Sequence, residues 1–421
     1  MKKLFFLLSI FLLFLSTVFY AQRKTVQNKK GQNECLNCHK DDENLPDDFK
    51  DYDVHLAAGL TCADCHGGDP TSDDEDIAMS KKNGFVGVPT RKDIPEFCGK
   101  CHSNFEFMKK YKPEVETDQV RQYYTSVHGK QLKKGDENVA VCTSCHTAHS
   151  ILPPKDPRSS VYALNVPTTC NNCHGDKKLM DKYDLPSDIY KKYVNSVHGI
   201  DLLKNKDVSG APACNDCHGN HGATPPGVSS IVNVCGTCHV NNFNFFKASK
   251  MGKKWKGDDD YHGCVTCHNN HDIQKPDDNF VGVSDSAICS DCHSEGDEGY
   301  SEAKEIHTEL VNLASLYDSA NVKLAKVKEL GMDDIDIGFM LKDAHQAMIK
   351  ARTTVHTFSS AKVAKLTVPG VKITKSAIKK ADEEISDYHT RRYGLGAATI
   401  ALLILIIGLY LKLKSLNKPE T

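Results

Sequence analysis

The sequence predicts a mostly irregular and α-helical protein. A body organised around repeated short motifs is followed by a long α-helical hairpin and one C-terminal transmembrane helix. Three observations support this fold class. The motif C-x-x-C-H occurs nine times before residue 300. After residue 300, apolar residues recur at helical spacing. Near the C-terminus, residues 394–411 carry no charged side chain.

The body between the two terminal apolar runs is too polar to fold around side chains alone. Hydrophobic residues make up 39% of the 421-residue chain, and many of them lie in those terminal runs. The remainder is rich in Gly, Asn, Asp and Lys, so side-chain burial would not offset the lost chain entropy. The sequence therefore predicts a core supplied by a large apolar group. A net charge of −2 offers no basic surface for nucleic acid.

All 18 cysteines fall in the C-x-x-C-H motifs. Two thiols three positions apart reach the two vinyl groups on one edge of a haem, and the next residue presents an imidazole to the iron. The pattern predicts nine covalent c-type haems. The attaching cysteines are Cys35, Cys38, Cys62, Cys65, Cys98, Cys101, Cys142, Cys145, Cys170, Cys173, Cys214, Cys217, Cys235, Cys238, Cys264, Cys267, Cys289 and Cys292. The proximal iron ligands are His39, His66, His102, His146, His174, His218, His239, His268 and His293.

Two other uses of paired cysteines compete with haem. A disulfide framework would explain an even cysteine count in an exported chain but not nine following histidines. Zinc sites can use C-x-x-C-H but pair two such knuckles and need no histidine at one fixed offset. Nine haems on residues 35–293 leave so little chain for each that we expect neighbouring haems to touch and conduct electrons.

Eleven histidines remain outside the motifs, and most follow a repeat. The copies read S-V-H-G at 126–129 and 196–199, and Y-H-G at 261–263, each followed by C-x-x-C-H-x-x-H and a second C-x-x-C-H. A degenerate first copy has Asp69 where the extra histidine would fall. The sequence thus predicts four two-haem modules behind one leading haem. A histidine three residues after the proximal one is better placed for a neighbouring iron than for its own.

Two helices are expected beyond the motifs, over about 300–330 and 335–366, with Pro369-Gly370 ending the second. His345 and His356 would share a face of the second helix. We expect this hairpin to supply distal ligands through His307 and His356, with His345 and His389 left open. The eight methionines show no fixed relation to the motifs. The predicted distal ligands are His55, His128, His149, His198, His221, His262, His271, His307 and His356.

The two ends of the chain predict export and anchoring. Residues 1–21 resemble a signal peptide with cleavage near Ala21, and an uncleaved anchor is the alternative. Residues 394–411 are long enough for one span, with a cytoplasmic tail at 412–421 rich in lysine. The predicted domains are a nonahaem domain at 22–299 and a helical hairpin at 300–393. The haem domain would lie in the periplasm at the cytoplasmic membrane.

The repeated unit S-V-H-G, C-x-x-C-H-x-x-H and C-x-x-C-H resembles bacterial multihaem cytochromes of the c3/c7 type over residues 35–293. The tether also looks like the NapC/NirT group of membrane-anchored cytochromes, although that group has an N-terminal anchor and fewer haems. The resemblance implies a respiratory electron carrier beside the quinone pool or a quinol-oxidising membrane subunit, with a periplasmic or outer-membrane redox partner.

Three function classes follow. A pure electron carrier is favoured, because enough spare histidines exist to close every iron and a closed iron binds no substrate. The alternative is a multihaem reductase of nitrite, hydroxylamine or a sulfur oxyanion, which needs one open iron. A conducting filament is the third class, and the membrane span argues against it.

Overall fold

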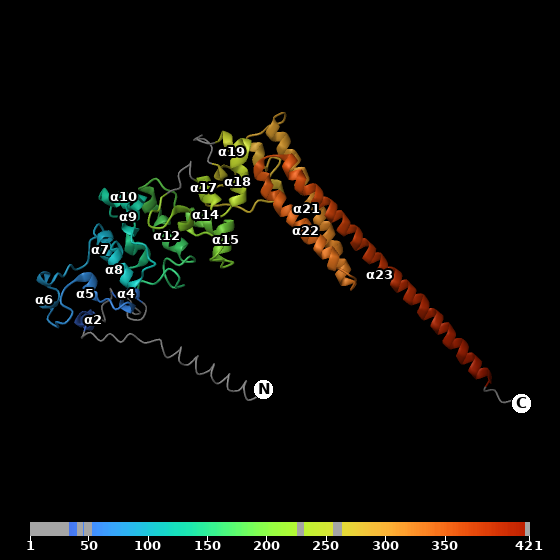
Figure 1. Ribbon diagram of the computed structural model, residues 1–421, viewed down its shortest axis with the longest axis horizontal. Helices are drawn as coiled ribbons and strands as arrows, with labels where there is room; N and C mark the ends of the chain where they lie inside the picture. The colour runs from blue at the N-terminus through green and yellow to red at the C-terminus, as the bar shows by residue number, and fades with distance from the viewer. Residues whose placement is uncertain (1–32, 40–44, 46–52, 225–230, 256–262, 417–421) are drawn as a thin grey trace. The chain divides into compact units, whose positions relative to one another are not determined.

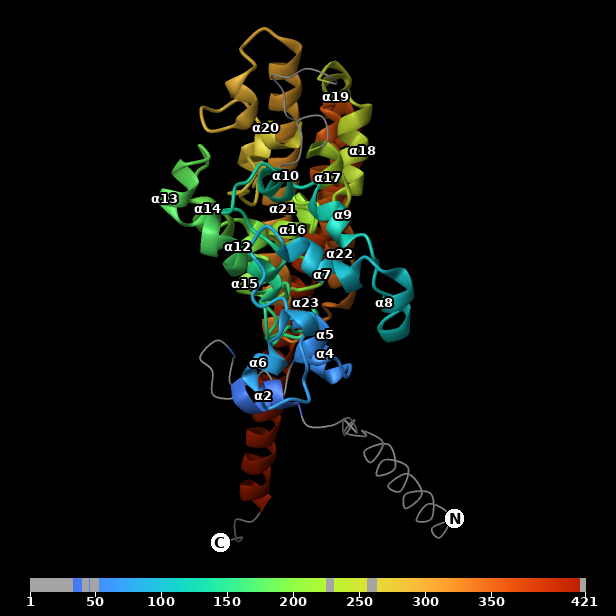
Figure 2. The ribbon, with the colours of Figure 1, turned by 90° about the vertical axis from the view of Figure 1, so that its left-hand side faces the viewer.

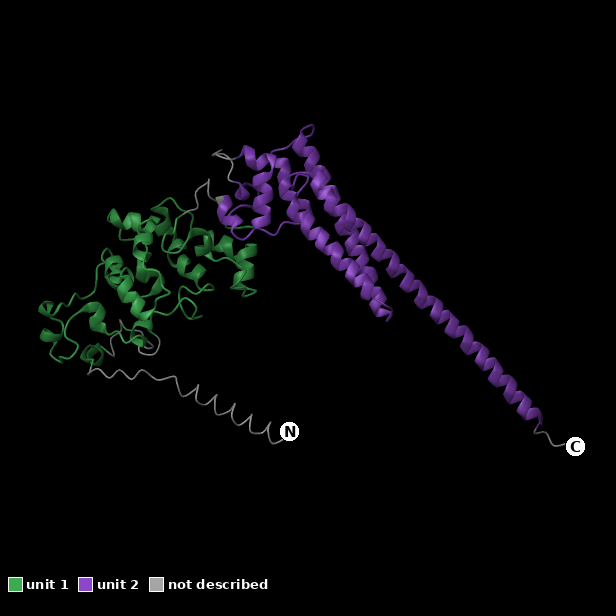
Figure 3. Ribbon diagram, viewed as in Figure 1, with its two compact units in different colours: residues 1–226, 271–273 green, residues 227–270, 274–421 purple. Residues whose placement is uncertain are grey.

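The computed structural model describes residues 33–39, 45, 53–224, 231–255 and 263–416. Within these residues the chain is helical and irregular and contains no strand, which confirms the predicted fold class. The chain forms two compact units (Figure 3). Unit 1 comprises residues 1–226 and 271–273, and unit 2 comprises residues 227–270 and 274–421. The predicted signal peptide at 1–21 lies outside the described residues.

Unit 1 consists of short helices joined by irregular segments (Figure 1). They are α2 (Glu34–His39), α4 (Val54–Ala57), α5 (Cys62–His66), α6 (Glu75–Ala78), η1 (Lys81–Asn83), α7 (Ile94–His102), α8 (Phe105–Tyr111), α9 (Gln119–Tyr123), α10 (Val127–Lys133), α11 (Cys142–His146), α12 (Val166–His174), α13 (Lys177–Asp181), α14 (Ile189–Val194), α15 (Val197–Leu203) and α16 (Cys214–His218).

Unit 2 begins with further short helices and ends in three long ones. The short elements are α17 (Ile231–Gly236), α18 (Val240–Ala248), α19 (Lys250–Lys254), α20 (Cys264–His268), η2 (Asp278–Phe280) and η3 (Ile288–Asp291). The long helices are α21 (Glu298–Glu329), α22 (Ile335–Thr354) and, after the turn η4 (Val355–Thr357), α23 (Ser360–Leu416).

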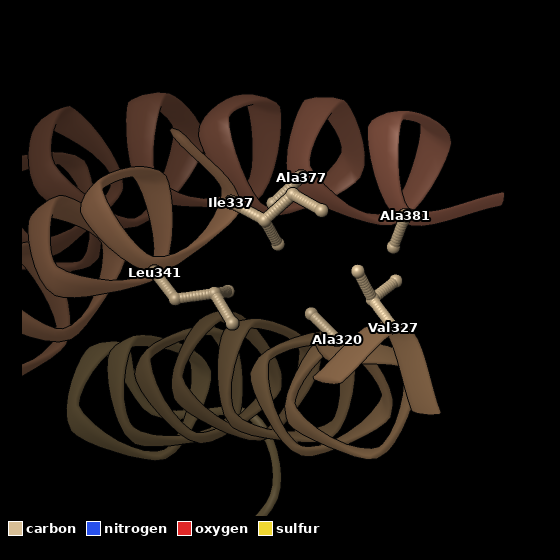
Figure 4. Close-up of a cluster of buried hydrophobic side chains, with 6 residues drawn as sticks. All are labelled: Ala320, Val327, Ile337, Leu341, Ala377 and Ala381. Atoms are coloured by element: carbon tan, nitrogen blue, oxygen red, sulfur yellow. The ribbon is translucent and has the colours of Figure 1, made fainter. Parts of the chain in front are cut away.

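The three long helices pack side by side as a bundle (Figures 1 and 2). Their contact is apolar and lined by small side chains, which lets the helix backbones approach closely. Figure 4 shows one cluster of buried residues in this contact, to which each helix contributes two residues. These are Ala320 and Val327 of α21, Ile337 and Leu341 of α22, and Ala377 and Ala381 of α23.

The predicted end of the second helix is wrong. α22 stops at Thr354, and Phe358 turns the chain with a left-handed φ of 50°. Pro369 lies inside α23 instead of ending a helix. Proline removes one backbone hydrogen bond there, and packing of the following residue offsets that loss. Gly370 lies so close to Leu313 that an added Cβ would come within 3.0 Å of Leu313 Cδ2.

His345 and His356 therefore do not share a helix, because His345 lies on α22 and His356 lies in η4. The predicted span at 394–411 forms the C-terminal part of α23, and every residue in it is exposed. Among the described residues, α23 is the one helix long and apolar enough to cross a membrane. Figure 3 shows α23 continuing past the ends of α21 and α22.

Candidate haem-binding sites

Each C-x-x-C-H motif lies on or next to one helical turn, which places both thiols and the imidazole near each other. In the first motif of each module the helix begins at the first cysteine, as in α5, α11, α16 and α20. The residue before the second cysteine caps three of these turns. Asp64 accepts a hydrogen bond from the Thr61 amide at 2.6 Å, and Asp216 accepts one from the Ala213 amide at 2.7 Å. Ser144 does the same for Val141 at 3.1 Å.

The two competing uses of cysteine find no support here. All 18 cysteines are described, and none is paired in a disulfide. The described part of the chain also holds no group of three or more His, Cys, Asp or Glu side chains arranged to bind a metal ion on their own.

The motifs of unit 1 follow one another in space in the order of the sequence. A hydrogen bond to the Cys142 thiol, together with burial, raises the pKa of Cys98 well above its ordinary value. The Cys170 thiol lies against that of Cys214 in the same way. These contacts join the second motif of one module to the first motif of the next.

Within a module the two motifs are also close. Burial, with the Cys101 thiol nearby, raises the pKa of Cys65 to about 11. Burial raises the pKa of Cys145 to about 11, and the nearby Cys170 thiol adds to this effect. The leading motif joins the row because Cys62 adds to the effect of burial in raising the pKa of Cys35.

Unit 2 continues the same arrangement with its three motifs. A hydrogen bond to the Cys264 thiol, together with burial, raises the pKa of Cys235 well above its ordinary value. Burial, with Cys289 close by, raises the pKa of Cys267 to about 11. In each unit, attachment sites that are consecutive in the sequence are thus neighbours in space. Unit 1 holds six of these sites and unit 2 holds three.

Six spare histidines lie opposite a motif histidine. Metal–imidazole bonds are about 2 Å long, so two imidazoles on opposite faces of one iron have ring centres roughly 6 Å apart. The observed distances between ring centroids all fall close to that value. The pairs are His55–His102 at 6.0 Å, His66–His149 at 6.4 Å, His128–His174 at 6.1 Å, His146–His221 at 6.0 Å, His218–His271 at 5.9 Å and His268–His356 at 6.1 Å.

The six pairs follow one rule. The histidine that precedes a module faces the second motif of that module, as His128 faces His174. The histidine three residues after a first motif faces the first motif of the preceding module, as His221 faces His146. In the last module no further repeat follows, and His356 of η4 takes that place opposite His268. Neighbouring modules therefore complete each other's sites.

Backbone hydrogen bonds explain why neighbouring modules interlock. The donor is the backbone amide of the residue just before the histidine that leads a module, namely His55, His128 or His198. The acceptor is a backbone carbonyl of the next module, two residues after the histidine that follows its first motif, namely His149, His221 or His271. Val54 donates to Ile151 at 2.9 Å, Val127 to Ala223 at 3.1 Å, and Val197 to Ile273 at 2.8 Å. Residues 271–273 belong to unit 1 for this reason.

The chain turns directly after the first motif of each module, and the residue at this turn has a positive φ angle. Gly67, Thr147, Gly219 and Asn269 each follow a first-motif histidine and have φ between 60° and 83°. Glycine adopts this conformation freely, but Thr147 and Asn269 adopt it only with strain. Strained backbone of this kind concentrates at functional sites, and here it turns the chain so that the next histidine leaves its own motif.

Burial keeps many of the paired imidazoles in the form that binds metal. It lowers the pKa of eight of them below the ordinary value, so they are neutral near pH 7. Neutral imidazole has the free lone pair that an iron ligand needs. The eight are His102, His128, His146, His174, His221, His268, His271 and His356.

The turn that carries the leading histidine recurs three times. Ser126 caps α10 by accepting from the Gly129 amide at 2.9 Å and donates to the Tyr123 carbonyl. Ser196 does the same with Gly199 and Tyr193 at the start of α15. Ser249 repeats both bonds with Gly252 and Phe246 at the start of α19. The sequence pattern missed this third copy because Met251 stands there instead of histidine.

The remaining predicted histidines have other surroundings. The Nδ1 atom of His307 lies 3.0 Å from the Asp278 carbonyl oxygen. His345 stacks on Tyr317 with ring centroids 5.6 Å apart, and His389 lies beside Tyr388. Among the described residues no ring contact joins these three to a motif histidine. His262 lies outside the described residues.

Comparisons with known proteins point to c-type haem. Residues 54–175 match the family model described as cytochrome c3, and residues 15–85 match that of cytochrome c-type protein NrfB-like. The multiheme cytochrome MtrA of Shewanella baltica (strain OS185) is 25% identical over 226 residues, which are 50% of this chain and 53% of that relative. The chain thus spans about half the length of the curated relative it matches. No solved structure is significantly similar to the chain.

Proposed function

We propose that this chain, as a multihaem c-type cytochrome, conducts electrons along a row of nine haems anchored to the cytoplasmic membrane. The observation that carries the proposal is the spatial order of the motifs, in which each attachment site lies next to the following one within its unit. Haems attached in such a row would touch their neighbours, and electrons would pass from one to the next.

The proposed distal ligands follow the pairing rule. His149, His221, His271 and His356 serve the first haem of each module, and His55 and His128 serve second haems. An iron with histidine on both faces has no site for substrate and tends to a low potential, because axial methionine is the ligand that raises it. Closed irons favour a conductor over a catalyst.

The long helix favours a membrane partner as electron donor. The haem sites of unit 2 lie at the η4 end of the bundle, since His356 faces His268 there. The span begins 34 residues after the first residue of α23, and a helix rises 1.5 Å per residue. The helix thus holds the unit 2 haems about 50 Å from the start of the span. A quinol-oxidising membrane subunit that reaches this height suits the geometry better than direct contact with the quinone pool.

The haem domain would then face the periplasm and pass electrons to a periplasmic or outer-membrane acceptor. The positive tail after the span agrees with this orientation, because cytoplasmic flanks carry excess Lys and Arg. Lys412 and Lys414 follow the span on α23. The name of the relative MtrA, a multiheme cytochrome, agrees with a role in electron transport.

Interrupting the row tests the proposal. Replacement of Cys170 and Cys173 by alanine removes the fifth haem and separates the haems before it from those after it. Membranes carrying the full chain are given quinol, and haem reduction is followed by absorbance. We expect the four haems before the gap to stay oxidised on the time scale that reduces them all in the wild type.

The matched control is the double replacement of Cys35 and Cys38, which removes one haem at the end of the row without creating a gap. It should leave the reduction of the other haems unchanged. Equal reduction of all remaining haems in both variants would show that electrons do not travel along the row.

One observation keeps the reductase alternative in play. In the first module, Asp69 stands at the position where the other modules have their extra histidine, the one that the pairing rule would direct to the haem of Cys35 and Cys38. The Asp69 carboxylate instead accepts hydrogen bonds from the Thr71 amide at 3.0 Å and hydroxyl at 2.7 Å. We therefore propose this iron as the first place to test for a reductase site. Turnover of nitrite, hydroxylamine or a sulfur oxyanion that is lost in the Cys35/Cys38 variant would reveal it.

A further inference from the structure

We propose that Met251 is the distal axial ligand of the ninth haem, whose proximal ligand is His293. The inference rests on the proposed function only in requiring a haem at Cys289 and Cys292. The ninth haem would then have His–Met ligation, whereas the pairs described above give histidine on both faces of their irons.

The first support is the shared turn in front of α10, α15 and α19. The capping serine has φ of −66°, −77° and −70° at Ser126, Ser196 and Ser249, with ψ of 164°, 163° and 164°. Each serine makes the same two hydrogen bonds, to the amide three residues ahead and the carbonyl three residues behind. Position two after the serine is His128, His198 and Met251 in turn.

The three turns also pack alike, as the surroundings of their glycines show. An added Cβ at Gly129 would lie 2.1 Å from the Tyr123 carbonyl oxygen, and one at Gly199 would lie 2.0 Å from that of Tyr193. At Gly252 the same atom would lie 2.1 Å from the Phe246 carbonyl oxygen. The three turns are therefore packed equally tightly against the preceding helix, and Met251 leaves the backbone where the two histidines do.

The pairing rule assigns this position to the second motif of its module. His128 faces His174 at 6.1 Å by that rule. Met251 belongs to the last module, whose second motif ends in His293, so the rule matches these two residues. A methionine thioether is an established iron ligand in c-type cytochromes.

An independent contact brings Met251 and His293 into one neighbourhood. Lys250, next to Met251, forms an ion pair with Glu298 at 2.6 Å. The following residue, Gly299, packs on the His293 ring so closely that an added Cβ would lie 2.2 Å from its Cε1 atom. The Nδ1 atom of His293 lies 3.2 Å from Asp297 Oδ1, which leaves Nε2 for the iron.

The register also explains why His262 is not the ligand favoured here, although the sequence pattern selected it. His262 precedes the first cysteine of its module by two residues. Ala140 and Pro212 hold that position in the other modules, where their carbonyls accept hydrogen bonds from Tyr123 and Tyr193 at 2.8 Å. His307 is the other histidine that competes for this iron. Its Nδ1 atom lies beside the Asp278 carbonyl oxygen, and its ring packs on Gly282.

Thioether ligation has a functional consequence. Methionine in place of histidine raises the reduction potential of a haem. The ninth haem would therefore be reduced first and would hold an electron at the end of the row that shares a unit with the membrane helix. The row would not be a chain of equivalent sites.

Near-infrared magnetic circular dichroism of the oxidised full-length protein tests the proposal, because bis-His and His–Met haems give charge-transfer bands at different wavelengths. We expect one His–Met band with the intensity of one haem. Replacement M251H should abolish it, add one bis-His haem and lower the highest potential in a redox titration. M251A should convert one iron to high spin. M180L, at a buried methionine of unit 1, should leave the spectrum unchanged.

Loss of one low-spin iron in H262A or H307A, with the spectrum of M251A unchanged, would overturn the proposal. A wild-type spectrum without a His–Met band would also overturn it. A haem count by intact mass on the same samples separates this failure from that of the proposed function, since nine haems without a His–Met band would leave the electron row intact.

Discussion

The haem-bearing segments of unit 1 and the three-helix bundle of unit 2 are stabilised in different ways. In unit 1 the buried apolar side chains form small separate clusters. One contains Ile94, Tyr123, Leu132, Val139 and Val141, and another contains Val166, Leu202 and Ala213. In the bundle, apolar residues of α21, α22 and α23 face one another along the helices. The bundle can bury its own core, but the haem-bearing segments need haem to supply theirs.

This difference separates two tasks. In the proposed function, the bundle would hold haem sites at one end and the membrane span at the other. The segments with the C-x-x-C-H motifs would carry the redox groups and depend on them for order. Changes in one region should therefore leave the signature of the other largely intact, and the predictions below use that independence.

Withholding haem should have the largest effect. We expect chain made without haem attachment to lose protection of backbone amides throughout residues 53–224, because the side-chain clusters there are too small to offset chain entropy. The bundle should keep its protection over α21, α22 and the paired part of α23. Hydrogen exchange with mass spectrometry measures both. Equal protection of unit 1 with and without haem would break the comparison.

Charging the span should release the protein from the membrane. A lysine at the centre of a transmembrane helix costs about 2.5–3.5 kcal/mol, so L403K combined with I406K should move the chain to the soluble fraction. Both side chains are exposed in the structure, so the bundle should be unaffected. The control variant K414E lies beyond the span. Retention of the doubly charged variant in the membrane would indicate another anchor, such as an uncleaved N-terminal segment.

Opening a cavity in the bundle should weaken it without touching the haems. Leu313 of α21 is fully buried, and its side chain packs near Gly370. L313A should lower the free energy of unfolding of the bundle by about 2–5 kcal/mol, as measured by chemical denaturation monitored by helical circular dichroism. V322A, on the same helix but exposed, is the control. A changed haem spectrum in L313A would mean that the two regions are not independent.

Removing one distal histidine should change a single iron. H221A takes away the imidazole opposite His146, so that iron should become high spin while overall stability changes little. Electron paramagnetic resonance of the oxidised protein detects the new signal. H345A is the matched control, because His345 also stacks on an aromatic ring but faces Tyr317. A high-spin signal in H345A and none in H221A would reverse the assignment.

Much of this organisation could be predicted from the sequence. The C-x-x-C-H motif fixes its own chemistry within five residues, and the helices of the bundle have long periodic patterns. The end of the second helix could not be predicted, because Pro369 signals a break that packing of Gly370 on Leu313 overrides. At such positions tertiary packing, and not the local sequence, decides where a helix ends.

The partners of the histidines were the other part that the sequence left open. Each pair joins residues from different repeats or different motifs, so spacing along the chain does not reveal it. Met251 was missed because the repeat was defined by its histidine. The structure shows that the recurring element is serine and glycine three residues apart, which make the turn, whereas the two residues between them vary.

The count of covalent haems tests the central claim most directly. Intact-mass spectrometry of the full-length protein, produced with haem attachment, should show the polypeptide plus nine haems. A homogeneous product with fewer haems would contradict the account, because at least one C-x-x-C-H motif would be empty and the proposed row of nine would be incomplete.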